Sequence, residues 1–447
     1  MRDSRVWVLG VALAGFGWSS AGAAGLDVQR PLHHVRGGES HLTQPRSGSA
    51  NHASATSARR ATQSIPAKTP SASGATTHSR AHIAAANAAA VAGVHGGHAT
   101  VRRAALARRH HYYERFTASS FASGDQFAND VTAGEDPVVR QTAIDALGDM
   151  YGTAVVIDPK NGRILAMVNQ KLALSPGAEP CSTIKITVAM AALSEGLVTA
   201  ETPVRLDGFH MNMTQALAKS NNLYFEELGR ELGFERIRHY ANQFGLGELA
   251  GYNITGEQLG AYPDEELPAA EGGVGRMCSF GQGVSLTPLQ LGAYVAALAN
   301  GGTLYYLQHP TTLADALEFM PKVKRTLDIA RYLPDIEPGM AGAVEFGTAR
   351  RLKAAFSQLP IFGKTGTCSD KGTRFGWFAS FSQAPQGGLV TVFFLEGGRP
   401  TFGPRAAELT GAFYKNLWDR NYFAGKGGQD AAFAHPVFET GKPGLTQ

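Results

Sequence analysis

The order of the regular elements expected along this chain constrains its fold more than any other feature. Two β-rich runs, residues 153–157 and 164–168, come first and are joined by hairpin turn residues at 158–162. Helical patterns follow, and the chain then returns to three strands and a last helix, expected at about 361–365, 375–381, 389–395 and 406–421. This order predicts an α+β fold: an antiparallel sheet built from both ends of the domain, flanked by helices, with an all-helical subdomain inserted.

The helical patterns between the two sets of strands rest on apolar spacing and on capping residues. Apolar residues three and four apart predict a helix from about 182 to 194: Ile186, Met190 and Leu193. Residues 216–232 and 237–244 are also predicted to be helical. Thr287 opens the sequence Thr-Pro-Leu-Gln, which has a cap, a proline at the first helical position and a glutamine that closes a capping box. That helix is expected to run to about Asn300.

The first 24 residues have the features of an export signal. Arg2 and Arg5 precede an apolar stretch, 6–18, and the small residues Ala21-Gly22-Ala23 fit a cleavage site. An uncleaved N-terminal anchor is the alternative. We expect an exported protein, in the periplasm or on the outer face of the cytoplasmic membrane, that touches the membrane only through its N-terminus if the signal is not cleaved. No other segment is long and apolar enough to cross a membrane.

Residues 25–131 are predicted to be a disordered basic linker rich in Ala, Ser, His and Arg. The formal charge of the whole chain is +4, but residues 25–115 alone carry +9, with ten of the fourteen histidines and almost no apolar periodicity. A solvated tether is the expected role. Metal capture by the histidines and attraction to anionic lipid or wall polymer are the alternatives. A folded domain is expected over 132–423, followed by a flexible tail, 424–447.

Ser182 opens a Ser-x-x-Lys motif that ends at Lys185. Cleavage of an amide by a serine needs a base for the hydroxyl proton, donors for the oxyanion and a hold on the peptide. At the start of a helix, the Lys185 amine can reach the Ser182 hydroxyl, and the Ser182 backbone N–H can point at an oxyanion. The base must be neutral, so burial and a second cation, Lys364, are expected to lower its pKa. A helix cap beside a surface lysine is the alternative.

Ser220-Asn221-Asn222 is the second motif, and it is expected in an ordered loop before an apolar helix. Ser220 can relay a proton between Lys185 and a leaving amine. Asn222 can donate to a substrate carbonyl and accept from Lys185. Taken alone, such a triplet is more often a helix cap, so its catalytic interpretation depends on the other motifs.

Lys364-Thr365-Gly366-Thr367 lies on a predicted strand. An extended substrate can pair with the exposed edge of such a strand, and Gly366 leaves room for close approach. Lys364 and Thr365 are expected to bind a terminal carboxylate. The backbone N–H of Thr367 is the expected second oxyanion donor.

In this order, the three motifs resemble those of the transpeptidase domain of penicillin-binding proteins, serine acyl-transferases related to β-lactamases. The resemblance covers about residues 150–418. The segment 155–167 resembles the opening hairpin of the family, and further segments match in their places: 218–225, 280–283, 287–290, 299–302, 347–349 and 376–378.

The resemblance implies a D,D-transpeptidase that acts on D-Ala-D-Ala stem peptides of peptidoglycan through a serine acyl-enzyme, in cell-wall synthesis. It implies β-lactams as covalent inhibitors and cell-wall synthesis proteins as partners. We expect no metal, no cofactor and no nucleic-acid partner. A D,D-carboxypeptidase, a serine β-lactamase and a β-lactam sensor without turnover are the alternatives. Glu226 and Glu227 lie on a predicted helix, and no clear motif for activating water is present.

The three cysteines leave at least one thiol unpaired. Cys181 stands where the family often has glycine, and the resemblance places Cys181 and Cys368 near the site, beside Ser182 and Thr367. Small buried side chains are one interpretation, and a bridge or redox control is the other. We expect at least one of these two to be a buried free thiol in the active-site wall.

Overall fold

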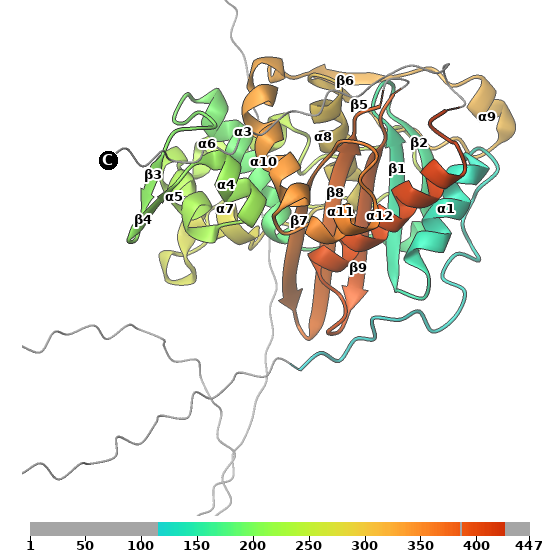
Figure 1. Cartoon of the computed structure of the whole chain (residues 1–447), viewed down its shortest axis with the longest axis horizontal. Helices are drawn as coiled ribbons and strands as arrows, with labels where there is room; N and C mark the ends of the chain where they lie inside the picture. The colour runs from blue at the N-terminus through green and yellow to red at the C-terminus, as the bar shows by residue number, and fades with distance from the viewer. Residues whose placement is uncertain (1–114, 385–386, 425–447) are drawn as a thin grey trace, which may run out of the picture. The chain divides into compact units, whose positions relative to one another are not determined.

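The computed structural model describes residues 115–384 and 387–424 of the 447-residue chain (Figure 1). The predicted signal segment, residues 25–114 of the predicted linker and the predicted tail beyond residue 424 lie outside the described residues. Within those two ranges, no helix combines the length and the apolar character that a bilayer span requires.

A five-stranded antiparallel sheet runs through the domain, with strand order β2-β1-β9-β8-β7 (Figure 1). Its strands are β1 (Gly152–Asp158), β2 (Arg163–Val168), β7 (Ile361–Asp370), β8 (Thr373–Ser382) and β9 (Val390–Gly397). The early hairpin therefore pairs with the late strands through β1 and β9. The predicted α+β fold, with a sheet built from both ends of the domain, is confirmed.

The sheet buries both faces, because alternate side chains of its strands enter two different apolar clusters. On β1, Val155 and Ile157 join the cluster shared with the helical subdomain and α8 (Pro288–Ala299). Their neighbours Ala154 and Val156 join the cluster on the other face, under α1 (Pro137–Leu147) and α12 (Gly403–Asp419). Successive side chains point to opposite faces of the sheet, and both faces are buried. The strands are therefore apolar at nearly every position rather than at every second one.

The helical subdomain lies beside the β7 edge of the sheet (Figure 1). Its elements are η1 (Cys181–Ile184), α3 (Lys185–Ser194), β3 (Val204–Leu206), β4 (Phe209–Met211), α4 (Met213–Lys219), α5 (Asn222–Leu232), α6 (Phe234–Gln243), η2 (Ala269–Glu271) and α7 (Gly273–Phe280). The predicted capping box at the start of α8 is present, because Thr287 and Gln290 each accept the other's backbone N–H. The inserted all-helical unit of the prediction thus holds apart from one short hairpin, β3–β4.

The helical pattern over residues 216–232 is not one continuous helix, and the loop expected at the second motif before an apolar helix is present. The pattern is broken into α4 and α5 at the second motif, where Ser220 takes a left-handed conformation with φ of 55°. Asn221 then caps α5, since its side chain accepts the backbone N–H of Tyr224. The helix-capping interpretation of the triplet therefore holds for Asn221, while Ser220 ends α4 and its hydroxyl accepts a hydrogen bond from Lys364.

The remaining elements are α2 (Gln170–Ala173), β5 (Thr303–Tyr305), α9 (Leu313–Leu317), β6 (Val323–Thr326), η3 (Ala330–Tyr332), α10 (Leu333–Glu345) and α11 (Arg350–Ala355). Of these, α2 lies between β2 and the subdomain along the chain, and the others connect the subdomain with the last three strands. Helix α10 packs on α4 so closely that a Cβ on Gly339 would lie 2.7 Å from the Leu217 side chain. Helix α10 also packs against β7, so it links α4, which ends at the second motif, to the strand that carries the third motif.

Residues 115–131, which the linker prediction included, pack against the end of the sheet. The Ser120 hydroxyl is buried, hydrogen-bonds Thr401 Oγ1 at 2.8 Å and accepts the Gly398 N–H at 2.8 Å. The backbone N–H of Thr117 donates to the Gly372 carbonyl. The predicted start of order near Thr132 is therefore too late, because small polar residues without apolar periodicity are held here by hydrogen bonds.

A chain shortened to begin at residue 115 is expected to melt as the full chain does, whereas one beginning at 132 should melt several degrees lower. The second chain lacks the Ser120 hydrogen bonds, and for a domain of this size each lost kcal/mol lowers the Tm by about 2–4 °C. Calorimetry of the two shortened chains beside the full one checks this. Equal melting of all three would show that residues 115–131 add nothing to stability.

Candidate active site

The first motif lies where the 3-10 turn η1 passes into α3. The Lys185 Nζ atom donates to the Ser182 hydroxyl at 2.8 Å, as the helical spacing predicts. Lys185 is fully buried, while Ser182 keeps partial exposure. The pair has the arrangement of a nucleophile and its base.

Two further acceptors hold the Lys185 amine. It donates to Asn222 Oδ1 at 2.9 Å, as predicted for the second motif, and to the backbone carbonyl of Ser279 at the end of α7. Burial lowers the pKa of Lys185 to about 7, while the Glu226 carboxylate acts in the opposite direction. A lysine near neutrality can take a proton at physiological pH.

The second lysine, Lys364, reaches the second motif from β7. Its Nζ donates to the Ser220 hydroxyl at 2.8 Å and to the Thr365 carbonyl at 3.0 Å. Burial first, and then the positive charge of Lys185, hold the pKa of Lys364 well below its ordinary value. The sequence predicted that Lys364 would help to lower the pKa of Lys185. In the structure burial is the cause at Lys185, and the repulsion acts on Lys364.

The third motif occupies β7, which is the edge strand of the sheet, as the substrate-pairing hypothesis requires. Gly366 faces the first motif, where a Cβ would lie 2.8 Å from the Pro180 carbonyl oxygen. Room at this position is therefore needed for the segment that carries the nucleophile. Thr365 Oγ1 hydrogen-bonds Thr348 Oγ1 at 2.6 Å, and Thr367 Oγ1 accepts the Gly403 N–H at 2.8 Å.

Cys181 and Cys368 form a disulfide, with their Cα atoms 5.5 Å apart. The expectation that one of the two would be a buried free thiol is therefore wrong. Their Cα atoms lie within bonding reach because the chain neighbours Ser182 and Thr367 meet across the seam between η1 and β7. Among the described residues the free cysteine is Cys278, which is buried, and burial raises the pKa of its thiol.

The structure brings all three motifs together, and it adds two groups that the sequence analysis did not select. The Ser279 carbonyl is a backbone group that any residue could supply, so no side-chain pattern marks it. Thr348 lies in the segment 347–349, which matched the family in sequence. The resemblance of this segment to the family could have pointed to Thr348 as a site residue.

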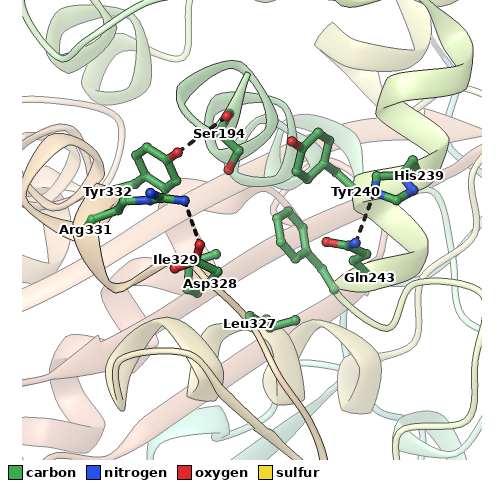
Figure 2. A pocket seen from close by; sticks show the side chains of 10 residues that line it. Ser194, His239, Tyr240, Gln243, Leu327, Asp328, Ile329, Arg331 and Tyr332 are labelled. Carbon is green, nitrogen blue, oxygen red and sulfur yellow. Dashed lines mark hydrogen bonds and ion pairs between the residues drawn. The ribbon is translucent and has the colours of Figure 1, made fainter. Parts of the chain in front are cut away.

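A separate pocket of about 170 Å³ lies at the other end of α3 (Figure 2). Tyr332 donates to the Ser194 carbonyl at 3.4 Å there, and Arg331 pairs with Asp328 at 2.6 Å. The lining residues are Ser194, His239, Tyr240, Gln243, Phe244, Leu327, Asp328, Ile329, Arg331 and Tyr332. None of these residues belongs to the three motifs. We therefore assign the candidate active site to the motifs and not to this pocket.

The chain belongs to the penicillin-binding protein transpeptidase family, because the model of the penicillin binding protein transpeptidase domain matches residues 152–415. Stage V sporulation protein D of Bacillus subtilis is 29% identical in an alignment 311 residues long that covers 58% of this chain and 47% of that protein. Peptidoglycan D,D-transpeptidase MrdA of Acinetobacter baumannii is 26% identical in an alignment 379 residues long that covers 70% of this chain and 53% of that one.

Solved structures agree on the fold. Pseudomonas aeruginosa PBP2, in complex with WCK 5153, matches with a TM-score of 0.56 at 22% identity, over 69% of this chain and 82% of that one. A peptidoglycan glycosyltransferase from Burkholderia ambifaria matches with a TM-score of 0.54 at 20% identity, over 65% and 98%. The chain spans about half the length of the curated relatives described above.

Proposed function

We propose that this chain is a penicillin-binding D,D-transpeptidase that acts on D-Ala-D-Ala stem peptides of peptidoglycan through a serine acyl-enzyme. The observation that carries the proposal is the hydrogen bond between the buried Lys185 amine and the Ser182 hydroxyl, at the meeting point of all three motifs. Names of relatives, such as peptidoglycan D,D-transpeptidase MrdA, support the same reaction class.

In the proposed acylation step, Ser182 Oγ attacks the carbonyl carbon of the penultimate D-Ala while neutral Lys185 takes the hydroxyl proton. The backbone N–H groups of Ser182 and Thr367 stabilise the oxyanion. The bond to the terminal D-Ala then breaks. The proton on Lys185 is proposed to pass to the leaving amine through Ser220. In the structure Ser220 contacts Lys364. The amine of Lys185 contacts Ser182, Asn222 and Ser279. This relay therefore requires the Ser220 hydroxyl to turn toward Lys185 when substrate is bound. Water or an acceptor amine later releases the peptide from Ser182.

The substrate is held by groups on both sides of the seam. Asn222 can donate its amide N–H to a substrate carbonyl while its oxygen accepts from Lys185. Lys364 and Thr365 are proposed to bind the terminal carboxylate, and an incoming anion favours the protonated form of Lys364. Gly366 keeps β7 close to the nucleophile.

Export to the periplasm or to the outer face of the membrane, and contact with cell-wall synthesis proteins, belong to the same proposal. β-Lactams are its proposed covalent inhibitors, because they carry an acyl group that the same serine can attack. A D,D-carboxypeptidase would use the same residues and differ only in the acceptor.

A β-lactamase would need a carboxylate free to activate water near the acyl-enzyme. Glu226 and Glu227 both pair with Arg230, at 3.1 and 2.8 Å, and Glu226 also accepts the Ser279 hydroxyl. These contacts occupy the carboxylates that the sequence offered for that role, which favours a long-lived adduct.

The lifetime of a fluorescent penicillin adduct tests this proposal. A transpeptidase or carboxypeptidase should keep the label for many minutes after excess penicillin is removed. Loss of the label within seconds, with continuous penicillin hydrolysis, would establish a β-lactamase instead. Stable labelling without release of D-Ala from a stem peptide would identify a sensor.

The rate constant of acylation is expected to rise with pH through about 7. Lys185, whose pKa burial lowers to about 7, must be neutral to accept the proton, so the rate should fall about tenfold per pH unit below that value. Glu226→Gln removes a charge that favours protonated Lys185 and should move this limb to lower pH. Glu227→Gln, which alters the same Arg230 pair, is the matched control. Rates independent of pH between 5.5 and 8.5 would contradict the role of Lys185.

A further inference from the structure

The residue before the proposed nucleophile has an unusual backbone. Cys181 lies in the left-handed region, with φ of 52°, and is buried. Glycine enters this region freely, whereas a residue with a Cβ atom enters it at a cost. The chain therefore keeps a side chain at a position whose conformation favours glycine.

The side chain of Cys181, which makes this conformation unfavourable, forms a disulfide. Cys181 is bonded to Cys368, 187 residues further along the chain, and Cys368 is half-buried on β7. The bridge joins the subdomain that carries Ser182 to the sheet edge that carries Thr367. Each cysteine is the immediate chain neighbour of one proposed oxyanion donor.

Other contacts close the same seam without a covalent bond. The Trp377 indole N–H donates to the Glu179 carbonyl at 3.0 Å, and the Lys364 amine on β7 donates to the Ser220 hydroxyl of the subdomain at 2.8 Å. Each of these contacts is a single hydrogen bond, so they allow small displacements of η1 relative to β7. A disulfide fixes the separation of the two backbones within a narrow range.

We propose that Cys181 and Cys368 are positioning residues, whose disulfide holds the backbone N–H groups of Ser182 and Thr367 at the separation that one oxyanion needs. The inference rests on the proposed function, because it takes these two N–H groups as the oxyanion donors. Such donors act only within a narrow range of distances from the oxygen, and loss of one donor lowers a rate by about 10²- to 10³-fold. Release of the bridge misplaces the donors without removing them, so a smaller loss is expected.

Two double variants separate the cross-link from the backbone strain. Cys181→Ser with Cys368→Ser removes the bridge and keeps a Cβ in the left-handed position. Cys181→Gly with Cys368→Ser removes both the bridge and the strain. Cys278 is left in place in both, since it is buried on α7, where its side chain lies against Gly229 of α5.

The measurement is the acylation of each folded variant by a fluorescent penicillin at 25 °C, resolved into the Kd of the first complex and the acylation rate constant. We expect the rate constant to fall about tenfold or more in both variants, with Kd changed less than about threefold. The glycine variant should melt above the serine variant. Wild-type rate constants in both variants would overturn the proposal and leave the bridge a stabilising role only.

If neither variant folds, the wild-type protein is treated with a small dithiol and assayed at once. The dithiol donates two electrons and two protons to the disulfide and becomes a cyclic disulfide, leaving two thiols on the protein. A fall in the acylation rate, reversed on reoxidation, supports the proposal, and an unchanged rate of reduced protein overturns it. Wild-type protein that forms no adduct at Ser182 would instead refute the proposed function itself.

Discussion

Ser182→Ala is expected to abolish covalent labelling by penicillin. Ser182 is the hydroxyl that accepts a hydrogen bond from the buried amine of Lys185, at the start of α3 and beside β7. Without Oγ no acyl bond can form, so intact-mass analysis should show one adduct on the wild-type protein and none on the variant.

Removal of Oγ from a partly exposed serine leaves the packing of the subdomain in place, so the variant should melt within a degree or two of the wild type. Ser123→Ala, which alters an exposed serine far from the motifs in sequence, is the control for the labelling procedure. An undiminished adduct in folded Ser182→Ala would show that another residue is acylated.

Lys185→Ala is expected to slow acylation by about 10²-fold or more. Loss of a general base costs about 10²- to 10⁴-fold, and Lys185 is the amine that contacts the Ser182 hydroxyl, whereas Lys364 contacts Ser220. The fall should lie in the acylation rate constant rather than in the Kd of the first complex, since Lys185 contacts the nucleophile.

Lys185 is fully buried, so its loss also leaves a cavity, and the rate must be compared on protein shown to be folded by its Tm. Lys219→Ala is the matched control, because Lys219 is an exposed lysine at the end of α4, beside Ser220. A near-wild-type rate in folded Lys185→Ala would remove this residue from the mechanism.

The sequence was sufficient to predict the elements that are determined by apolar periodicity and by local capping residues. The β1–β2 hairpin, the late strands and the start of α8 follow from apolar runs, turn residues and the Thr287–Gln290 capping box. The meeting of the three motifs was also predictable, because the chemistry requires them to act on one carbonyl.

The sequence could not predict features that depend on the tertiary arrangement. The loop at the second motif was expected, but the left-handed conformation of Ser220, which ends α4, is a backbone feature that apolar spacing does not mark. The Ser279 carbonyl is a backbone group without a sequence signal. The disulfide depends on a Cα separation that only the assembled seam fixes.

The central claim, acyl transfer from a D-Ala-D-Ala stem peptide through Ser182, is tested most directly by mass analysis of a reaction. The protein is incubated with a stem pentapeptide, with and without an acceptor amine. We predict release of D-Ala, a trapped acyl group on the peptide that contains Ser182, and a cross-linked product when the amine is present. Hydrolysed tetrapeptide alone would assign a carboxypeptidase. No D-Ala release from folded wild-type protein, or equal release by Ser182→Ala, would contradict the account.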